Sequence, residues 1–225
     1  MAAYDLVIFD CDGTLVDSEL ANNIAFCDEL AAEGLTQYTP DYAMTHFVGS
    51  SVPTLMKHIA AETGHVFPDD FRDRYIRNVS RRIPNDVRSI PHAYETVEAI
   101  SKIVPVCVAS NGERMNVVDC VKAIKTMDVF FTEQTVFTKD QVENPKPAPD
   151  LFLYAAAQMG NVPPERCLVI EDSKFGARAG VAAGMDVLGF TGSAHDKLGR
   201  AAELSAERVI AVIDDLRDIL NYLQD

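Results

Sequence analysis

Residues 6–17 read LVIFDCDGTLVD, and this stretch decides the fold that we expect. Its first four residues are apolar, which predicts a short buried β-strand over 6–9. Gly13 breaks the pattern, so Asp10 and Asp12 stand where the strand gives way to a loop. Ligands bind at the carboxyl ends of the strands in open α/β sheets. Two carboxylates at this place indicate a metal site or an aspartyl nucleophile, although an Asp-x-Asp-Gly pattern is also common in simple turns.

The rest of the chain alternates between strand-like and helical segments. Apolar runs predict further strands over 104–110, near Val136, over 167–170 and 186–190, and near 208–210. Helical patterns separate them over 91–103, 115–127, 149–159 and 174–183. This alternation predicts an α/β fold with a Rossmann-like parallel sheet core and helices on both faces.

One segment departs from that alternation. Residues 18–84 are helical throughout by pattern, with helices expected over 19–33, 42–47, 52–63 and 69–82. We therefore expect a helical insertion over 18–84, after the first strand, and a core built from 1–17 and 85–225.

Composition excludes several classes of partner. The formal net charge of −14 argues against nucleic acid and anionic membranes, and no apolar run approaches the roughly 18 residues of a membrane span. The N-terminus lacks a signal-peptide pattern. The five cysteines are odd in number and form no CxxC pair, which favours reduced, buried thiols in a cytoplasmic protein over disulfides or zinc.

Three further polar elements are expected at the same edge of the sheet as Asp10 and Asp12. Ser110-Asn111-Gly112 follows one predicted strand, and Glu171-Asp172-Ser173 follows another. Lys146 lies in the proline-rich stretch NPKPAPD over 144–150. Each element alone has a plainer explanation as a turn, a solvated loop charge or a helix cap.

Together these elements suit phosphoryl transfer. Several carboxylates at one place need a cation, and oxygen ligands favour a hard one such as Mg²⁺. A hydroxyl, loop N–H groups and a lysine can hold a phosphate. One Asp can attack phosphorus while another moves the proton.

The combined motifs resemble the haloacid dehalogenase superfamily. The first motif of that family stands here as Asp10-Cys11-Asp12-Gly13-Thr14, its serine motif as Ser110, and its acidic motif as Glu171-Asp172-Ser173. The form Lys-Pro-x-Pro-Asp at Lys146 is similar to the β-phosphoglucomutase-like branch. The resemblance covers nearly the whole chain.

The resemblance implies a role for each residue. Asp10 would be the nucleophile and a Mg²⁺ ligand, and Asp12 the general acid/base, with its carbonyl on the metal. Glu171 and Asp172 would complete the metal site. Ser110, Lys146 and the backbone N–H of Asn111 would bind the phosphoryl group. The insertion would be the cap that closes over the site and selects a small phosphorylated metabolite.

The insertion carries the signals for specificity. Gly49 and Ser50 resemble the cap specificity loop of the branch, but Val52 and Pro53 stand where its mutases usually place an arginine, and Asn22 stands in place of a histidine. These departures favour a phosphatase over the alternative, a sugar-phosphate mutase. The 110–112 and 176–185 stretches resemble bacterial 6-phosphogluconate phosphatases of this branch.

An arginine-rich segment gives a hypothesis about the substrate. Arg74, Arg77 and Arg81 share one predicted helix face. They are either a solvated surface or a basic wall that binds a second anionic group, as a sugar-acid phosphate would carry.

Two other classes of function fit the residues less well. A phospho-accepting receiver module gathers similar residues, but in a different order and without a helical insertion. Dehalogenase chemistry is less consistent with an acid/base at Asp12. The sequence leaves the oligomeric state open.

Overall fold

The computed structural model describes residues 3–47, 50, 52–124 and 127–223, so Gly49 lies outside the described residues. The chain forms two compact units. The first comprises Met1–Asp17 with Arg88–Asp225, and the second comprises Ser18–Val87. The second boundary lies three residues beyond the predicted 84, because helix α4 (Phe71–Asp86) continues through Pro84.

The first unit is built on a six-stranded parallel sheet in the order β5-β4-β1-β6-β7-β8. The strands are β1 (Leu6–Phe9), β4 (Val106–Ser110), β5 (Val136–Thr138), β6 (Cys167–Glu171), β7 (Asp186–Phe190) and β8 (Ala211–Ile213). Ile8 of β1 pairs with Cys107 on one side and Val169 on the other. The chain winds outward from β1 through β4 to β5, then returns to β6 beside β1. The strand order therefore reverses next to β1, which is where open α/β sheets bind ligands.

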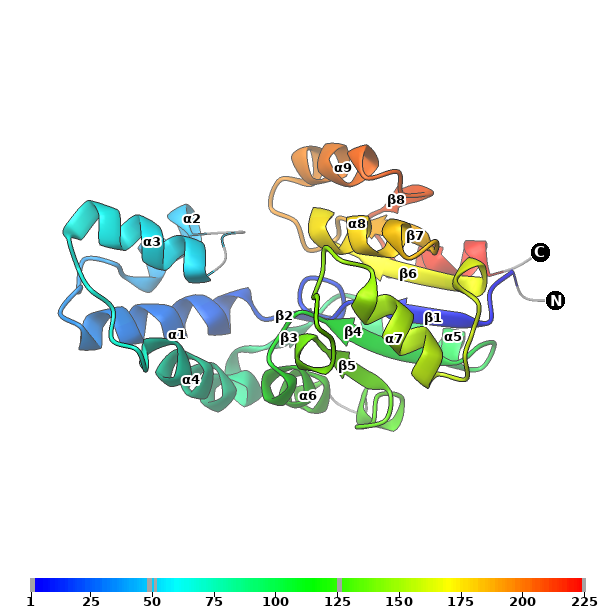
Figure 1. Ribbon diagram of the computed structural model, residues 1–225, viewed down its shortest axis with the longest axis horizontal. Helices are drawn as coiled ribbons and strands as arrows, with labels where there is room; N and C mark the ends of the chain where they lie inside the picture. Colours follow the sequence, from blue (N-terminus) through cyan, green and yellow to red (C-terminus); the bar gives the residue numbers. More distant parts are fainter. Residues whose placement is uncertain (1–2, 48–49, 51, 125–126, 224–225) are drawn as a thin grey trace. The chain divides into compact units, whose positions relative to one another are not determined.

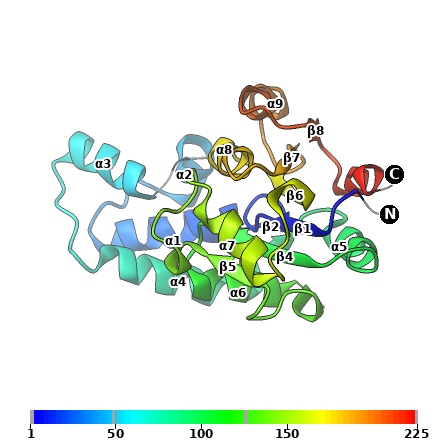
Figure 2. The same ribbon diagram turned by 45° about the vertical axis from the view of Figure 1, so that its right-hand side comes forward.

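Helices cover both faces of the sheet (Figures 1 and 2). The side chains of Leu6, Ile8, Cys107 and Val169 form one core with helices α7 (Asp150–Gln158), α8 (Lys174–Ala182) and α9 (Lys197–Ala206). Helices α5 (Ala93–Ser101) and α6 (Arg114–Ala123) and the 3₁₀ segment η4 (Leu216–Tyr222) lie on the other face. Three short 3₁₀ turns complete the unit: η1 (Met127–Val129), η2 (Lys139–Gln141) and η3 (Pro164–Arg166). The predicted α/β class is confirmed.

Some predicted elements were misplaced or missed. The last strand begins at Ala211 rather than near 208, because Arg208 turns through a positive φ of 65° before β8. Helix α9 was not predicted, although Asp196 caps it by accepting a hydrogen bond from the backbone N–H of Gly199. The short antiparallel pair β2 (Val16–Asp17) and β3 (Arg88–Ser89) was also missed, because two-residue strands carry no periodic pattern.

The second unit is helical, with α1 (Glu19–Ala32), α2 (Pro40–His46), α3 (Val52–Thr63) and α4. Its core is centred on Phe26, whose ring lies edge-on to Phe47, Phe71 and Tyr75 with centroids 5.8–5.9 Å apart. These aromatic contacts hold the helices of this unit together.

Two predictions from composition can be compared with the structure. All five cysteines are free and buried. Among the described residues, no helix combines the length and the apolar character that a membrane crossing requires.

Candidate active site

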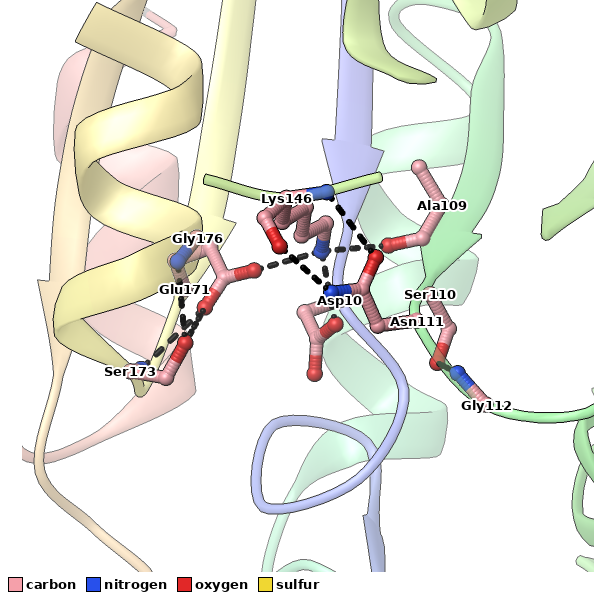
Figure 3. Close-up of polar contacts among 9 residues, drawn as sticks. All are labelled: Asp10, Ala109, Ser110, Asn111, Gly112, Lys146, Glu171, Ser173 and Gly176. Atoms are coloured by element: carbon pink, nitrogen blue, oxygen red, sulfur yellow. Dashed lines mark hydrogen bonds and ion pairs between the residues drawn. The ribbon is translucent and has the colours of Figure 1, made fainter. Parts of the chain in front are cut away.

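Five of the predicted site residues, Asp10, Ser110, Asn111, Lys146 and Glu171, meet at one edge of the sheet (Figure 3). Asp10 directly follows β1, and Ser110 and Glu171 are the last residues of β4 and β6. Parallel strands bring these three positions together because their carboxyl ends share one edge. Lys146 reaches the same place from the loop between η2 and α7.

The ammonium group of Lys146 joins the two central strands. Its Nζ lies 2.8 Å from Asp10 Oδ1 and 2.5 Å from Glu171 Oε1, and it donates to the carbonyl of Ala109 at 2.7 Å. The side chain is only 3% exposed and also lies over the ring of Phe152. Burial alone would lower the pKa of Lys146, but the two carboxylates raise it above its ordinary value. The lysine is therefore a permanent buried cation.

Asn111 fixes the loop that carries Lys146. Its side-chain amide donates to the carbonyl of Lys146 at 2.9 Å, and its Oδ1 accepts from the backbone N–H of Lys146 at 3.1 Å. These two hydrogen bonds join two loops that are 35 residues apart in the sequence. The side chain of Asn111 thus has a positioning task that the sequence did not reveal.

Three carboxylates crowd the same spot. One oxygen from each of Asp10, Glu171 and Asp172 lies within 4.8 Å of the others. Burial raises the pKa of Asp10 well above its ordinary value, Lys146 partly opposes this, and the neighbouring carboxylates raise it further. Burial and the charge of Glu171 likewise raise the pKa of Asp172 to about 7. The cluster holds more negative charge than one lysine neutralises.

The chemistry of these donors fits a magnesium ion. All the candidate ligands are carboxylate oxygens, which hard divalent cations prefer. A divalent cation bound here would offset the excess of negative charge, to which the raised pKa of Asp172 also points. Asp10, Glu171 and Asp172 are therefore the residues that could hold the metal.

Glu171 is held rigidly from its other side. Its Oε2 accepts hydrogen bonds from the backbone N–H and the hydroxyl of Ser173, at 3.1 and 3.0 Å. The Ser173 hydroxyl also accepts from the N–H of Gly176 at 3.0 Å and so caps helix α8. A Cβ atom at Gly176 would fall 1.8 Å from Glu171 Oε1, so only glycine fits there. The sequence indicated that Ser173 could cap a helix, but it did not indicate the hydrogen bonds from Ser173 to Glu171.

Asp12 lies toward the serine loop. A Cβ placed on Gly112 would stand 3.6 Å from Asp12 Oδ2 and 3.2 Å from the Ser110 hydroxyl, so these two groups border the same small space. The Ser110 oxygen accepts from the N–H of Gly112 at 3.0 Å and is buried. The acid/base candidate and the phosphate-binding candidate are thus neighbours, as the proposed chemistry needs.

The arginines of the second unit have different surroundings. Arg74 pairs with Glu33 and lies 3.3 Å from Glu29 and 3.5 Å from Asp70. Its guanidinium joins α4 to the carboxylates of Glu29 and Glu33, and a role in substrate binding stays a prediction. The carboxylates at and just after the end of α1 form ion pairs with the Arg74 guanidinium. The spacing of residues within α4 alone could not reveal these partners.

Two other arginines and Ser50 remain at the surface. Arg77 and Arg81 are exposed, and the Arg81 side chain donates to the Arg77 carbonyl at 3.3 Å. Ser50 is also exposed. The predicted role of Gly49 lies outside the described residues.

Fold and site together define an α/β enzyme with a lysine-bridged acidic cluster at the carboxyl edge of its sheet. Residues 7–190 match the family described as haloacid dehalogenase-like hydrolase. The chain belongs to this family, as the motifs at Asp10, Ser110, Lys146 and Glu171 indicated.

Known relatives agree with this assignment. The chain is 30% identical over 198 residues to the 6-phosphogluconate phosphatase of Escherichia coli (strain K12), covering 88% of this chain and 87% of that protein. It is 31% identical over 186 residues to the fructose-1-phosphate phosphatase of the same organism, covering 82% of this chain and 95% of that protein. Among solved structures, a haloacid dehalogenase family hydrolase from Deinococcus radiodurans R1 with bound phosphate and sodium has a TM-score of 0.76 and 30% identity, covering 100% of this chain and 99% of that one.

Proposed function

We propose that the protein is a Mg²⁺-dependent phosphatase that hydrolyses a small phosphorylated metabolite through an aspartyl-phosphate on Asp10. The main support is the geometry around Lys146, whose Nζ lies 2.8 Å from Asp10 Oδ1 beside a three-carboxylate cluster. Two of the relatives are phosphatases by name. A carboxylate that attacks a phosphate needs positive charge at that place, and a lysine together with a metal would supply it.

The proposed reaction has two displacements. In the first, a carboxylate oxygen of Asp10 bonds to phosphorus, the ester P–O bond breaks, and Asp12 gives its proton to the leaving alkoxide. In the second, Asp12 removes a proton from water, the water oxygen bonds to phosphorus, and the bond to Asp10 breaks to release inorganic phosphate. When bound to Asp10, Asp12, Glu171 and Asp172, Mg²⁺ would neutralise the charge that repels the two anions.

Three groups would bind the phosphoryl oxygens. Ser110, the last residue of β4, would offer its hydroxyl, and the next residue, Asn111, its backbone N–H. Lys146 would contribute its charge. In this proposal residues 18–84 act as the cap. Closure of a cap excludes water from the first displacement and so protects the intermediate.

The proposed substrate is a sugar or sugar-acid phosphate, with 6-phosphogluconate as the first candidate. Two relatives act, by name, on 6-phosphogluconate and on fructose 1-phosphate. A sugar acid carries a carboxylate besides its phosphate, and the exposed Arg77 and Arg81 offer charge for it. The five free thiols favour a reducing compartment, so we place the enzyme in the cytoplasm.

The test is phosphate release from a panel of esters with Mg²⁺ and with EDTA. The panel contains 6-phosphogluconate, fructose 1-phosphate and glucose 6-phosphate, and the products are also examined for isomerised sugar phosphates. Mg²⁺-dependent phosphate release without isomers supports the proposal. Isomer formation without phosphate release would establish the alternative, a sugar-phosphate mutase.

A further inference from the structure

We propose that Ser193, in the loop between β7 and α9, is a positioning residue that fixes the Gly13–Thr14 peptide, one residue beyond Asp12. This inference deepens the proposed function and rests on it. Ser193 belongs to none of the four sequence elements that predicted the site, and it lies 180 residues from its partner, Gly13.

The contact itself is short and specific. The Ser193 hydroxyl donates to the carbonyl oxygen of Gly13 at 2.6 Å, and both the hydroxyl and the carbonyl lie in a partly buried place. Gly13 is the residue that directly follows Asp12. A hydrogen bond here therefore acts on the backbone that orients the acid/base candidate.

Gly13 needs such a restraint. Its φ of +84° lies in the left-handed region, and glycine has the widest freedom of any residue to leave a given conformation. Its N–H is held by the carbonyl of Val16 at 2.7 Å. On its other side, the N–H of Thr14 donates to the carbonyl of Cys11 at a long 3.3 Å. Of these two hydrogen bonds to the Gly13–Thr14 peptide, the one from Ser193 is the shorter.

Gly13 also lies against the candidate metal ligand Asp172. A Cβ atom at Gly13 would fall 2.4 Å from Asp172 Oδ2, so the backbone lies directly against that carboxylate. A rotated Gly13 peptide would shift Asp12 relative to Ser110 and would also disturb Asp172. One hydrogen bond therefore acts on the acid/base candidate and on a candidate metal ligand.

The loop that carries Ser193 is itself firmly placed. The N–H and hydroxyl of Thr191 both donate to the carbonyl of Ile213 in β8, at 2.9 and 3.3 Å. Ala194 N–H donates to the Thr191 carbonyl at 3.0 Å and closes a turn around Ser193. A Cβ at Gly192 would fall 2.2 Å from the ring of Phe190, so the turn packs tightly on the end of β7. Ser193 is presented by a preorganised turn rather than by a loose loop.

The experiment compares three variants of the full chain. Ser193→Ala removes the hydroxyl, Ser193→Thr keeps one, and Ser205→Ala makes the same change at an exposed position on α9. We measure kcat and KM on the best ester of the panel, the melting temperature, and the hydrogen exchange rate of the Thr14 amide. For Ser193→Ala we expect kcat to fall about tenfold with KM within twofold, and the Thr14 amide to exchange faster. Ser193→Thr should recover most of kcat, and Ser205→Ala should match the wild type.

Three results would overturn the inference. They are a Ser193→Ala kcat within twofold of wild type, an equal loss in Ser193→Thr, and an unchanged Thr14 exchange rate. If the wild type hydrolyses no ester, the proposed function has failed. The exchange rate, which needs no substrate, then decides alone whether Ser193 holds the Gly13 peptide.

Discussion

The two units of this protein each place a cation among carboxylates, with different consequences. In the first unit, Lys146 stands between Asp10 and Glu171 with its side chain 3% exposed. In the second, Arg74 stands among three acidic side chains with 26% exposure. Water screens the charges around Arg74, so that cluster serves mainly to hold two helices together. The cluster around Lys146 is buried and holds more carboxylates than one lysine neutralises, so it could also hold a divalent cation.

Changing one carboxylate in each unit tests most directly whether the two clusters differ in function. Asp10→Asn removes the proposed nucleophile, so we expect phosphate release to fall at least about a thousandfold. Asp70→Asn, the matched change beside Arg74, should leave the rate within about twofold. Initial rates with Mg²⁺ measure both. Substantial activity in Asp10→Asn would exclude an aspartyl-phosphate on this residue.

Removing Lys146 should also destabilise the protein. Lys146→Met leaves Asp10 and Glu171 buried without their partner, and breaking such a buried pair typically costs about 3–5 kcal/mol. Urea unfolding at pH 8 gives the change in the free energy of unfolding. A loss below about 1 kcal/mol would show that the pair is solvated, as around Arg74. Part of the lost stability should return at pH 5, where the raised pKa of Asp10 lets its carboxyl group take up a proton.

The stability of the metal-free protein should depend on pH through Asp172. Its pKa is about 7 in the folded chain against an ordinary 3.8. The folded state therefore binds the extra proton between these values, and stability falls as pH rises from about 4 to about 7. A tenfold difference in proton affinity between the folded and unfolded chains corresponds to about 1.4 kcal/mol of stability. Mg²⁺ needs the ionised carboxylate, so it should raise the melting temperature more at pH 8 than at pH 5.

Asp172→Asn supplies the control for this pH effect. The variant cannot titrate at this position and loses a candidate ligand, so its stability should vary less with pH and respond less to Mg²⁺. Thermal melts from pH 4 to 8, with EDTA and with Mg²⁺, measure both. Superimposable pH profiles for wild type and variant would contradict the role given to Asp172.

The smallest effect is expected at Arg74. Arg74→Met removes a partly exposed set of ion pairs that water screens, so we expect a much smaller loss of stability than in Lys146→Met. KM for 6-phosphogluconate should stay within twofold, because the guanidinium is engaged with α1. Arg77→Met and Arg81→Met change exposed arginines on the same helix and should raise KM if they bind the sugar acid. A large KM increase in Arg74→Met alone would instead support the predicted basic wall at this arginine.

The prediction from sequence was strongest where structure is local. Strand β1 and the positions of Asp10, Ser110 and Glu171 followed from apolar runs that end in polar residues. Helix α9 was missed because most of its residues are polar or small, and Leu204 is the one buried residue among those that the structure describes in it, so its apolar pattern is weak. The short strands β2 and β3 were missed because pairing between residues some 70 positions apart leaves no local pattern.

The sequence by itself determined the class of the fold and the chemical groups of the site. Periodicity of apolar residues sets strands and helices, and strand ends deliver Asp10, Ser110 and Glu171 to one edge. Only the tertiary structure decided how those groups are paired. Lys146 meets a carboxylate 136 residues away, Arg74 one 41 residues away, and Ser193 a carbonyl 180 residues away. Such contacts depend on how distant segments pack in space, and local propensity contains no information on that packing.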